Sequence, residues 1–388
     1  MAEAGLTVML VAGEPSGDVL GARLMAALKL RTMGRVRFIG VGGPLMAGQG
    51  LASLFPFSEL AVVGIAEVLP RLFNLLRRMR QTAALAKRER PDVVVTIDVP
   101  GFSFEVAMLL RGAGIPLVHY VAPTVWAWRP GRAKRIARYY DHLLALLPFE
   151  PPYFERVGLG ASFVGHPVVE SGAGRGQGAI FRLRHGIAET TPLLTVLPGS
   201  RRGEIARLAE PFGGALAMLK ERFPGLTAAV PTVPAVAEQA RAVAASWPVP
   251  SIVIEDEREK YDAFAASRAA LAASGTVALE LALARLPAVV AYRINWLTHL
   301  IVRAVVKVKY ANLVNLILDR PVVPELLQAD CVPERLAEAV AALMIEGEER
   351  AAQLEVGERM AELLRPGDQP PSLSAADTVL KIAQRSKG

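Results

Sequence analysis

The chain has 388 residues, of which 52% are hydrophobic and 21% are charged, so it forms a folded protein of two or three domains and is not intrinsically disordered. Its formal net charge of +7 favours anionic partners, which include nucleic acid, an anionic membrane surface and phosphorylated substrates. A single cysteine, Cys331, excludes an internal disulfide and a thiol cluster for zinc, and it fits a reducing cytoplasm.

Short apolar runs alternate with helical patterns along the whole chain. This alternation predicts parallel sheets with crossover helices. A Gly-rich stretch at 171–178 separates two series of runs, which predicts two consecutive α/β domains joined within 165–180. The expected strands are 6–12, 36–40, 92–98, 116–121 and 143–147, followed by 193–197, 227–230, 251–254, 269–272 and 287–291.

The expected domain limits follow from this division. We expect Rossmann-like domains at 1–168 and 169–364, with parallel sheets facing a cleft. The remaining segment, 365–388, carries a helical pattern that should pack back on the first domain. No basic region precedes the first strand, and no apolar run reaches the roughly 18 to 20 uncharged residues that span a bilayer. We therefore expect no cleaved signal peptide and a soluble or peripheral protein.

The first expected strand leads into a Gly-rich turn, Gly13–Asp18. The spacing of its glycines matches neither a dinucleotide fingerprint nor a Walker loop. Open α/β sheets nevertheless bind ligands at the carboxyl ends of their strands. Glu14, Ser16 and Asp18 are therefore candidate site residues, with helix capping as the alternative role.

A second candidate, Asp98, ends the apolar strand 92–98 and is followed by Pro100-Gly101. A carboxylate at the rim of a sheet is partly desolvated, and it can serve as the general base for a hydroxyl in an interdomain cleft. An Asx turn is the alternative. His119, in the next expected strand, is more typical of a buried structural histidine than of a catalytic one.

Basic residues cluster at 71–90, 129–138 and 303–309. The first and third clusters are interleaved with apolar side chains, which favours amphipathic surfaces facing lipid headgroups over solvated helix faces. We expect a lipid-facing helix over 63–80, with an ordinary core helix as the alternative. Beside the second cluster, Trp126 and Trp128 could hold a sugar ring or simply pack a helix.

Two turns in the second half indicate a nucleotide diphosphate site. The motifs 197–204 and 273–280 each follow an apolar strand and lead into a helix, where unpaired N–H groups and the helix dipole favour phosphate. Arg201 can add a charged fork, and Glu280 can accept from a ribose diol. Ordinary helix caps are the alternative. No Asp-x-Asp pair follows a strand, so a metal-held diphosphate is disfavoured.

These motifs together resemble the lipid-A-disaccharide synthases of Gram-negative bacteria. The resemblance implies a two-domain glycosyltransferase fold of the B type. It also implies transfer of 2,3-diacylglucosamine from its UDP derivative to the 6-hydroxyl of 2,3-diacylglucosamine 1-phosphate, at the cytoplasmic face of the inner membrane. The matching segments are 13–18, 64–69, 98–102, 125–129, 147–150, 165–167, 197–201, 274–280 and 323–328.

The resemblance also suggests roles for single residues. Asp98, Glu14 and Ser16 become the expected catalytic residues, with Asp98 as the base, and neither cofactor nor metal is expected. The expected ligands of UDP are Ser200, Arg201, Ser274, Gly275, Thr276, Glu280, Asn315, Glu325 and Gln328. One departure is Val314, which stands where the family usually has proline.

Two other functions compete with this interpretation. A non-hydrolysing UDP-sugar epimerase has a similar two-domain fold, but it needs no lipid-facing surface. A basic nucleic-acid-binding protein would explain the charge but not the two turns, and the sequence contains no recognisable nucleic-acid module. We therefore expect a peripheral membrane enzyme without a nucleic-acid partner; a homodimeric assembly stays open.

Overall fold

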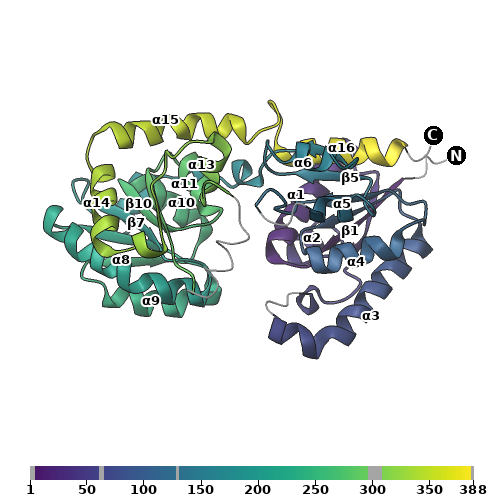
Figure 1. Ribbon diagram of the computed structural model, residues 1–388, viewed down its shortest axis with the longest axis horizontal. Coiled ribbons are helices and arrows are strands. Elements are labelled where there is room, and N and C mark those ends of the chain that lie inside the picture. The colour runs from purple at the N-terminus through teal and green to yellow at the C-terminus, as the bar shows by residue number, and fades with distance from the viewer. Residues whose placement is uncertain (1–4, 61–64, 128–130, 296–307, 386–388) are drawn as a thin grey trace. The chain divides into compact units, whose positions relative to one another are not determined.

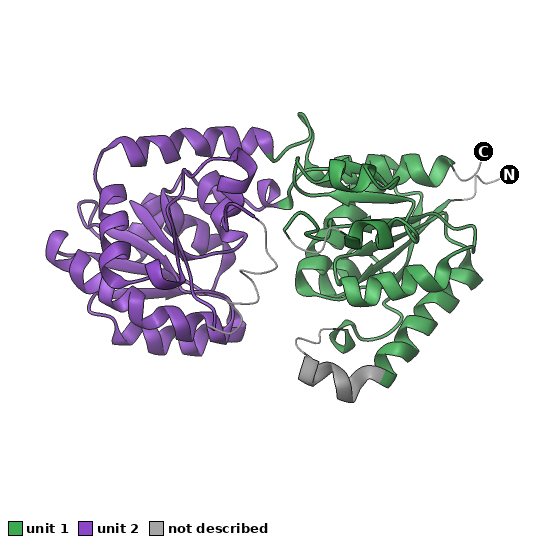
Figure 2. Ribbon diagram, viewed as in Figure 1, with its two compact units in different colours: residues 1–167, 364–388 green, residues 168–363 purple. Residues whose placement is uncertain are grey.

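The computed structural model describes residues 5–60, 65–127, 131–295 and 308–385. The chain divides into two compact units, each built around its own sheet (Figure 2). Unit 1 consists of 1–167 together with 364–388, and unit 2 consists of 168–363. Within unit 1, the His166 N–H donates to the Leu364 carbonyl at 2.9 Å, which ties the C-terminal segment to the end of the N-terminal one.

Unit 1 contains a six-stranded sheet in the order β2-β1-β3-β4-β5-β6, and all of its strands are parallel. The strands are β1 Leu6–Ala12, β2 Val36–Val41, β3 Val93–Ile97, β4 Leu117–Tyr120, β5 His142–Ala145 and β6 Gly160–Phe163. The helices are α1 Pro15–Arg31, α2 Pro44–Gly48, α3 Ile65–Glu89, α4 Pro100–Leu110, α5 Gly131–Ile136, α6 Pro151–Glu155 and α16 Pro371–Arg385.

Helices cover both faces of this sheet. Successive side chains of β1 point to opposite faces and are apolar on both, so each face needs a covering layer. Val8 and Leu10 pack on the side of α1 and α16, whereas Met9 and Val11 pack on the side of α3 and α4. The C-terminal helix α16 lies against α1, where Arg31 and Asp377 form an ion pair of 2.7 Å (Figure 1). The last helix of the chain therefore completes the core of the first unit.

Unit 2 repeats this architecture with the order β12-β11-β10-β7-β8-β9, again all parallel. The strands are β7 Leu193–Leu197, β8 Thr227–Pro231, β9 Ser251–Ile254, β10 Ala269–Ala273, β11 Ala288–Tyr292 and β12 Glu325–Leu327. The helices are α7 Gly178–Arg184, α8 Arg202–Arg222, α9 Ala237–Ser246, α10 Glu257–Ala266, α11 Val277–Leu283, α13 Leu313–Leu318, α14 Pro333–Met344 and α15 Glu348–Leu363.

The predicted α/β class with parallel sheets is confirmed, and each of the ten expected strands has a counterpart. The prediction missed β6 and β12, which are short edge strands of partly exposed residues without an apolar run. The charged run at 255–257 leads into a helix, since α10 begins at Glu257 with Asp256 as its N-cap. Among the helices that the structure describes, none is both long and apolar enough to cross a membrane.

Candidate functional site

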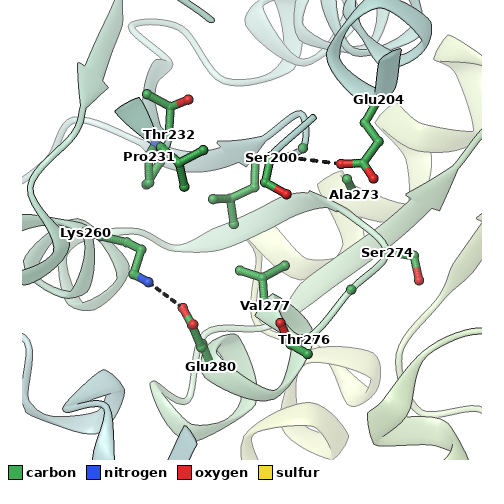
Figure 3. Close-up of a pocket in the computed structure, with 14 residues that line it drawn as sticks. Ser200, Glu204, Pro231, Thr232, Lys260, Ala273, Ser274, Thr276, Val277 and Glu280 are labelled. Carbon is green, nitrogen blue, oxygen red and sulfur yellow. Dashed lines mark hydrogen bonds and ion pairs between the residues drawn. The ribbon is translucent and has the colours of Figure 1, made fainter. Parts of the chain in front are cut away.

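A pocket of about 250 Å³ lies at the carboxyl edge of the unit 2 sheet, where open α/β sheets bind ligands (Figure 3). Its walls come from the segments that follow β7, β8 and β10, together with one side chain of α10. Pockets for whole drug-sized ligands have volumes of about 300–1,000 Å³, so this one suits part of a larger molecule. The lining residues are Leu197, Gly199, Ser200, Glu204, Pro231, Thr232, Val233, Lys260, Ala273, Ser274, Gly275, Thr276, Val277 and Glu280.

The turn between β7 and α8 is built around Gly199 and Glu204. Gly199 has a φ of 124°, and a Cβ on it would lie 2.6 Å from the Cβ of Glu204, so only glycine fits there. The Glu204 carboxylate accepts from the backbone N–H groups of Ser200 at 3.1 Å and Arg201 at 3.3 Å. These donors were expected to be unpaired, and that part of the prediction is wrong because Glu204 forms a capping box with the helix start.

Arg201 does not line the pocket. Its guanidinium pairs with Glu204 at 3.0 Å, and its side chain is 77% exposed. Because the Arg201 side chain is largely in solvent, this ion pair contributes little to stability, and Arg201 can exchange Glu204 for another anion at small cost. The Arg201 guanidinium is therefore free to bind another anion beside the turn between β7 and α8.

A partly buried ion pair lies on the opposite side of the pocket. Lys260 Nζ is 2.8 Å from Glu280 Oε2, and each side chain is 20% exposed; Figure 3 shows the two groups pointing toward each other. Burial alone would lower the pKa of Lys260, but the charge and hydrogen bond of Glu280 raise that pKa above its usual value. The pocket thus contains a fixed ammonium group, which sequence reasoning missed because only the fold brings α10 beside α11.

Ser274, Gly275 and Thr276 line the pocket as predicted neighbours of Glu280, whereas Asn315, Glu325 and Gln328 do not line it. Asn315 is fully buried, and its amide accepts from the Val322 and Val323 N–H groups and donates to Val323 O and Glu325 Oε1. All four of its hydrogen-bonding positions are therefore used within the protein.

Glu325 and Gln328 are likewise engaged with the backbone. Glu325 accepts from the Ala311 and Asn312 N–H groups at 2.8 and 2.9 Å, and Gln328 pairs with the backbone of Ile294. This cluster reaches the pocket through a 3.3 Å hydrogen bond from Ser274 Oγ to Ala311 O. Asn315, Glu325 and Gln328 hold the segment behind the pocket wall.

Val314, which we expected to depart from the pattern that the sequence resembles, takes part in a helix cap. It lies in the first turn of α13, and its N–H donates to the side chain of Asn312 at 2.8 Å. A proline at this position has no N–H and could not make this cap. The Asn312 cap thus uses a backbone donor that proline lacks.

In unit 1, Asp98 follows β3 in a strained turn. Asp98 and Val99 have φ values of 53° and 45°, and a left-handed conformation is a genuine outlier for a β-branched residue such as Val99. Each such residue costs about 1–3 kcal/mol, and strain of this kind is concentrated at functional sites. Burial raises the pKa of the half-buried Asp98 carboxyl, and a hydrogen bond from the Val99 N–H opposes this rise.

The Gly13–Asp18 turn lies beside the Asp98 turn, because β1 and β3 are neighbours and a Cβ on Gly13 would be 3.2 Å from Val99 Cγ2. Glu14 and Ser16 are exposed there. Asp18 is instead buried, and its carboxylate accepts from the N–H groups of Gly43, Leu45 and Met46 at 2.9–3.0 Å. Asp18 therefore caps α2, which leaves Glu14 and Ser16 as the accessible groups of this turn.

His119 is a buried structural histidine, which matches the more typical role expected for it. It is 1% exposed, and its Nδ1 lies 2.8 Å from Thr96 Oγ1. Burial and the charge of Arg132 lower the pKa of His119 to about 3, so the ring is neutral at physiological pH. It has no access to a substrate proton.

Trp126 is held by Glu150, a buried carboxyl that follows β5. The indole N–H donates to Glu150 Oε1 at 3.2 Å, and the Leu146 and Leu147 N–H groups donate to Oε2. Burial raises the pKa of Glu150 to about 7 in spite of these hydrogen bonds. Trp126 also contacts Phe149 edge to face at 5.2 Å, while Trp128 lies outside the described residues.

The helix expected over 63–80 corresponds to α3, although 63–64 and the side chains of 65–72 lie outside the described residues. Beyond them, Phe73 is 86% exposed and Leu76 is 38% exposed. Both line a shallow surface groove together with Arg77 and Arg80. Apolar side chains among arginines, free of a core role, favour a lipid-facing surface. The third basic cluster, 303–309, lies almost wholly outside the described residues.

Comparisons with solved structures show the fold. MurG of Acinetobacter baumannii superposes with a TM-score of 0.60 at 17% identity, covering 97% of this chain and 99% of its own. The UDP-GlcNAc 2-epimerase of Neisseria meningitidis, solved with UDP-GlcNAc bound, gives a TM-score of 0.62 at 12% identity, covering 98% and 100%. The expected B-type glycosyltransferase fold is confirmed, but at these identities the likeness does not separate transferases from epimerases.

Comparisons of sequence separate them. The family described as lipid-A-disaccharide synthetase matches residues 8–378. The lipid-A-disaccharide synthase of Rhodospirillum centenum is 59% identical over 379 residues, which cover 97% of this chain and 94% of that protein. Its counterpart in Paramagnetospirillum magneticum is 50% identical over 386 residues, covering 98% and 99%. The chain belongs to the lipid-A-disaccharide synthase family of glycosyltransferases.

Proposed function

We propose that this enzyme transfers 2,3-diacylglucosamine from its UDP derivative to the 6-hydroxyl of 2,3-diacylglucosamine 1-phosphate, giving a β-1,6 disaccharide 1-phosphate and UDP. The observation that carries the proposal is the family match over 8–378. Release of UDP from the two diacylated sugars tests it, with the donor alone as control. Release that requires the acceptor supports transfer, whereas interconversion of the donor without acceptor would instead indicate an epimerase.

The donor's UDP moiety is assigned to the unit 2 pocket. Glu280 is assigned to accept hydrogen bonds from ribose hydroxyls, and the ion pair with Lys260 at 2.8 Å orients its carboxylate. The hydroxyls of Ser200 and Thr276 add neutral donors around the cavity, and Ser274 Oγ, whose proton goes to Ala311 O, adds an acceptor. Asn315, Glu325 and Gln328 support this site through the backbone behind it.

The diphosphate needs positive charge, which Arg201 supplies by exchanging Glu204 for a phosphate. A guanidinium binds phosphate through two parallel N–H donors, which makes it suited to this exchange. The charge that develops on the UDP leaving group is then stabilised by Arg201, and by Lys260 at longer range, and no metal ion is assigned to the reaction. Full activity in the presence of EDTA is the expected result, and EDTA-sensitive turnover would contradict it.

Asp98 is assigned as the general base. Its carboxylate accepts the proton of the acceptor 6-hydroxyl while that oxygen bonds to the anomeric carbon. The bond between the anomeric carbon and the diphosphate oxygen breaks with its electron pair, so the configuration inverts and UDP leaves as the anion. Burial, which raises the pKa of Asp98, makes the carboxylate a better proton acceptor than a fully solvated one. Glu14 and Ser16 on the neighbouring turn are assigned to acceptor contacts.

The acyl chains of the substrates require an apolar surface, which we assign to α3. Phe73 and Leu76 provide apolar contact, and Arg77 and Arg80 provide charge for anionic headgroups. Burial of each methylene is worth about 0.8 kcal/mol, so a few contacts select an acylated substrate over a bare sugar. With this surface, the enzyme is proposed to bind peripherally to the cytoplasmic face of the inner membrane.

A further inference from the structure

A chain of buried polar side chains ends at the backbone of Asp98. It consists of His119 on β4, Thr96 on β3, Tyr140 before β5 and Ser103 on α4, and none of the four is more than 4% exposed. His119 Nδ1 lies 2.8 Å from Thr96 Oγ1, which lies 2.8 Å from Tyr140 Oη. Tyr140 Oη donates to Ser103 O at 2.9 Å, and Ser103 Oγ donates to Asp98 O at 2.7 Å.

One fixed acceptor determines the direction of these hydrogen bonds. The Ser103 carbonyl can only accept, so the single phenolic proton of Tyr140 is given to it. Tyr140 Oη then accepts the Thr96 hydroxyl proton, and Thr96 Oγ1 in turn accepts from His119 Nδ1. This assigns the neutral Nδ1–H tautomer to His119. These four side chains therefore form a network of neutral hydrogen bonds, in which each group donates to the next in the direction of α4 and the Asp98 turn.

The hydrogen-bond network ends at the Asp98–Val99 turn, whose conformation the local sequence would not adopt by itself. Asp98 and Val99 are both left-handed, and Val99 is the N-cap of α4 without a side-chain cap. The Ser103 hydroxyl holds the Asp98 carbonyl from the first turn of α4, and Tyr140 holds the backbone of Ser103. A strained backbone conformation persists when the surrounding contacts hold it in place. These hydrogen bonds hold the Asp98–Val99 turn in this way.

We propose that Ser103, Tyr140, Thr96 and His119 are positioning residues for Asp98, and that they fix its carboxylate for proton transfer by holding the turn that carries it. This inference rests on the assignment of Asp98 as the base. Each link is a neutral group that touches the next, and only Ser103 touches Asp98. Burial keeps Tyr140 and His119 neutral, because it raises the pKa of the former and lowers the pKa of the latter to about 3.

A double-mutant cycle tests the proposal. Ser103→Ala removes the link to Asp98 O and should lower kcat about tenfold with little change in KM, because misplacement of a reacting group by a fraction of an ångström has such effects. In an Asp98→Asn background the same change should have no further effect on kcat, since a positioning residue acts only through the group it positions. Ser103→Thr, which keeps the hydroxyl, should restore turnover.

Two further variants guard against a simple loss of folding. Tyr140→Phe removes the bond to Ser103 O but keeps the ring beside His119 and Phe104, and a smaller fall in kcat is expected. Thr82→Val is the matched control: Thr82 is a fully buried threonine of unit 1 whose hydroxyl donates to Arg78 O, and its loss should leave kcat unchanged. Unfolding midpoints of all variants are measured alongside.

The outcomes separate the two proposals. Near-normal turnover in Asp98→Asn overturns the base and the positioning network together. If Asp98→Asn is inactive but folded Ser103→Ala and Tyr140→Phe turn over like the unmodified enzyme, only the network is overturned. Equal losses from Ser103→Ala with and without the Asp98 carboxylate overturn it as well, because they indicate a general structural role.

Discussion

The two units carry the same scaffold but differ at the carboxyl edges of their sheets. The edge of unit 2 is rich in charge: Lys260 pairs with Glu280, and Arg201 pairs with Glu204 across a turn that requires Gly199. The edge of unit 1 carries the half-buried carboxyl of Asp98 on a left-handed turn, held by neutral hydroxyls. The difference fits the two tasks proposed for these edges, since a diphosphate is bound by charges, whereas a base needs a fixed position and a raised pKa.

The largest effect should come from Asp98→Asn. The amide keeps the size of the side chain but cannot accept the 6-hydroxyl proton, and a positioned base contributes about 10² to 10⁴ in rate. We expect kcat to fall by that amount in the UDP-release assay, with an unfolding midpoint close to that of the unmodified enzyme. Turnover within a factor of a few of normal would move the role to Glu14 on the neighbouring turn.

Arg201→Ala should weaken UDP-sugar binding about ten- to a hundredfold, because one hydrogen bond to a charged group is worth about 1.5–3 kcal/mol. Arg202→Ala is the matched control, since Arg202 is an exposed neighbour that does not line the pocket. Calorimetric titration with the donor measures both. Unchanged affinity in Arg201→Ala would contradict the assignment of the diphosphate to the turn between β7 and α8.

Phe73→Ser should reduce binding to acidic liposomes about fivefold, because a partly inserted aromatic ring contributes on the order of 1 kcal/mol. Stability should hardly change, since the side chain is 86% exposed. Leu183→Ser on unit 2, where Leu183 is 85% exposed, controls for the general loss of an exposed apolar group. Equal liposome binding by Phe73→Ser and Leu183→Ser would contradict a lipid-facing role for α3.

The smallest effect is in the pH dependence. Burial raises the pKa of Asp98, so the base becomes protonated, and turnover is lost, as the pH falls through this raised value. The acid limb of kcat should therefore lie above the usual value for aspartate of about 3.9. A pH–rate profile at saturating substrates measures it, and an acid limb at or below that value would indicate that the carboxyl is fully solvated in the working enzyme.

The sequence could predict the parts of both sites that lie next to strand ends. Asp98, Ser200 and the turn at 274–276 follow apolar strands, and in a parallel sheet such positions gather at one edge. Lys260 could not be found in this way, because it belongs to a charged run and only the packing of α10 against the sheet brings it to Glu280. The network under Asp98 was hidden for the same reason, since its members come from four separate segments.

Helix capping was an alternative that the sequence offered for residues near helix starts but could not decide. Glu204 covers the N–H groups that a phosphate was expected to find unpaired, and Asp18 caps α2 instead of facing a substrate. In both cases a carboxylate near a helix start had two possible partners, a ligand or the protein's own backbone. Only the distances decide between them. Asn315 shows the same ambiguity for an amide, because its hydrogen bonds are all made inside the fold.

Proton transfer is assigned to the sheet edge of unit 1 and UDP binding to the sheet edge of unit 2. Calorimetric titration of UDP into Asp98→Asn tests this assignment most directly. Since Asp98 belongs to unit 1 and the pocket assigned to UDP belongs to unit 2, the variant should bind UDP with the dissociation constant of the unmodified enzyme while its turnover is lost. A variant that loses UDP affinity in proportion to its turnover would contradict this account, because Asp98 would then act in donor binding and not in proton transfer.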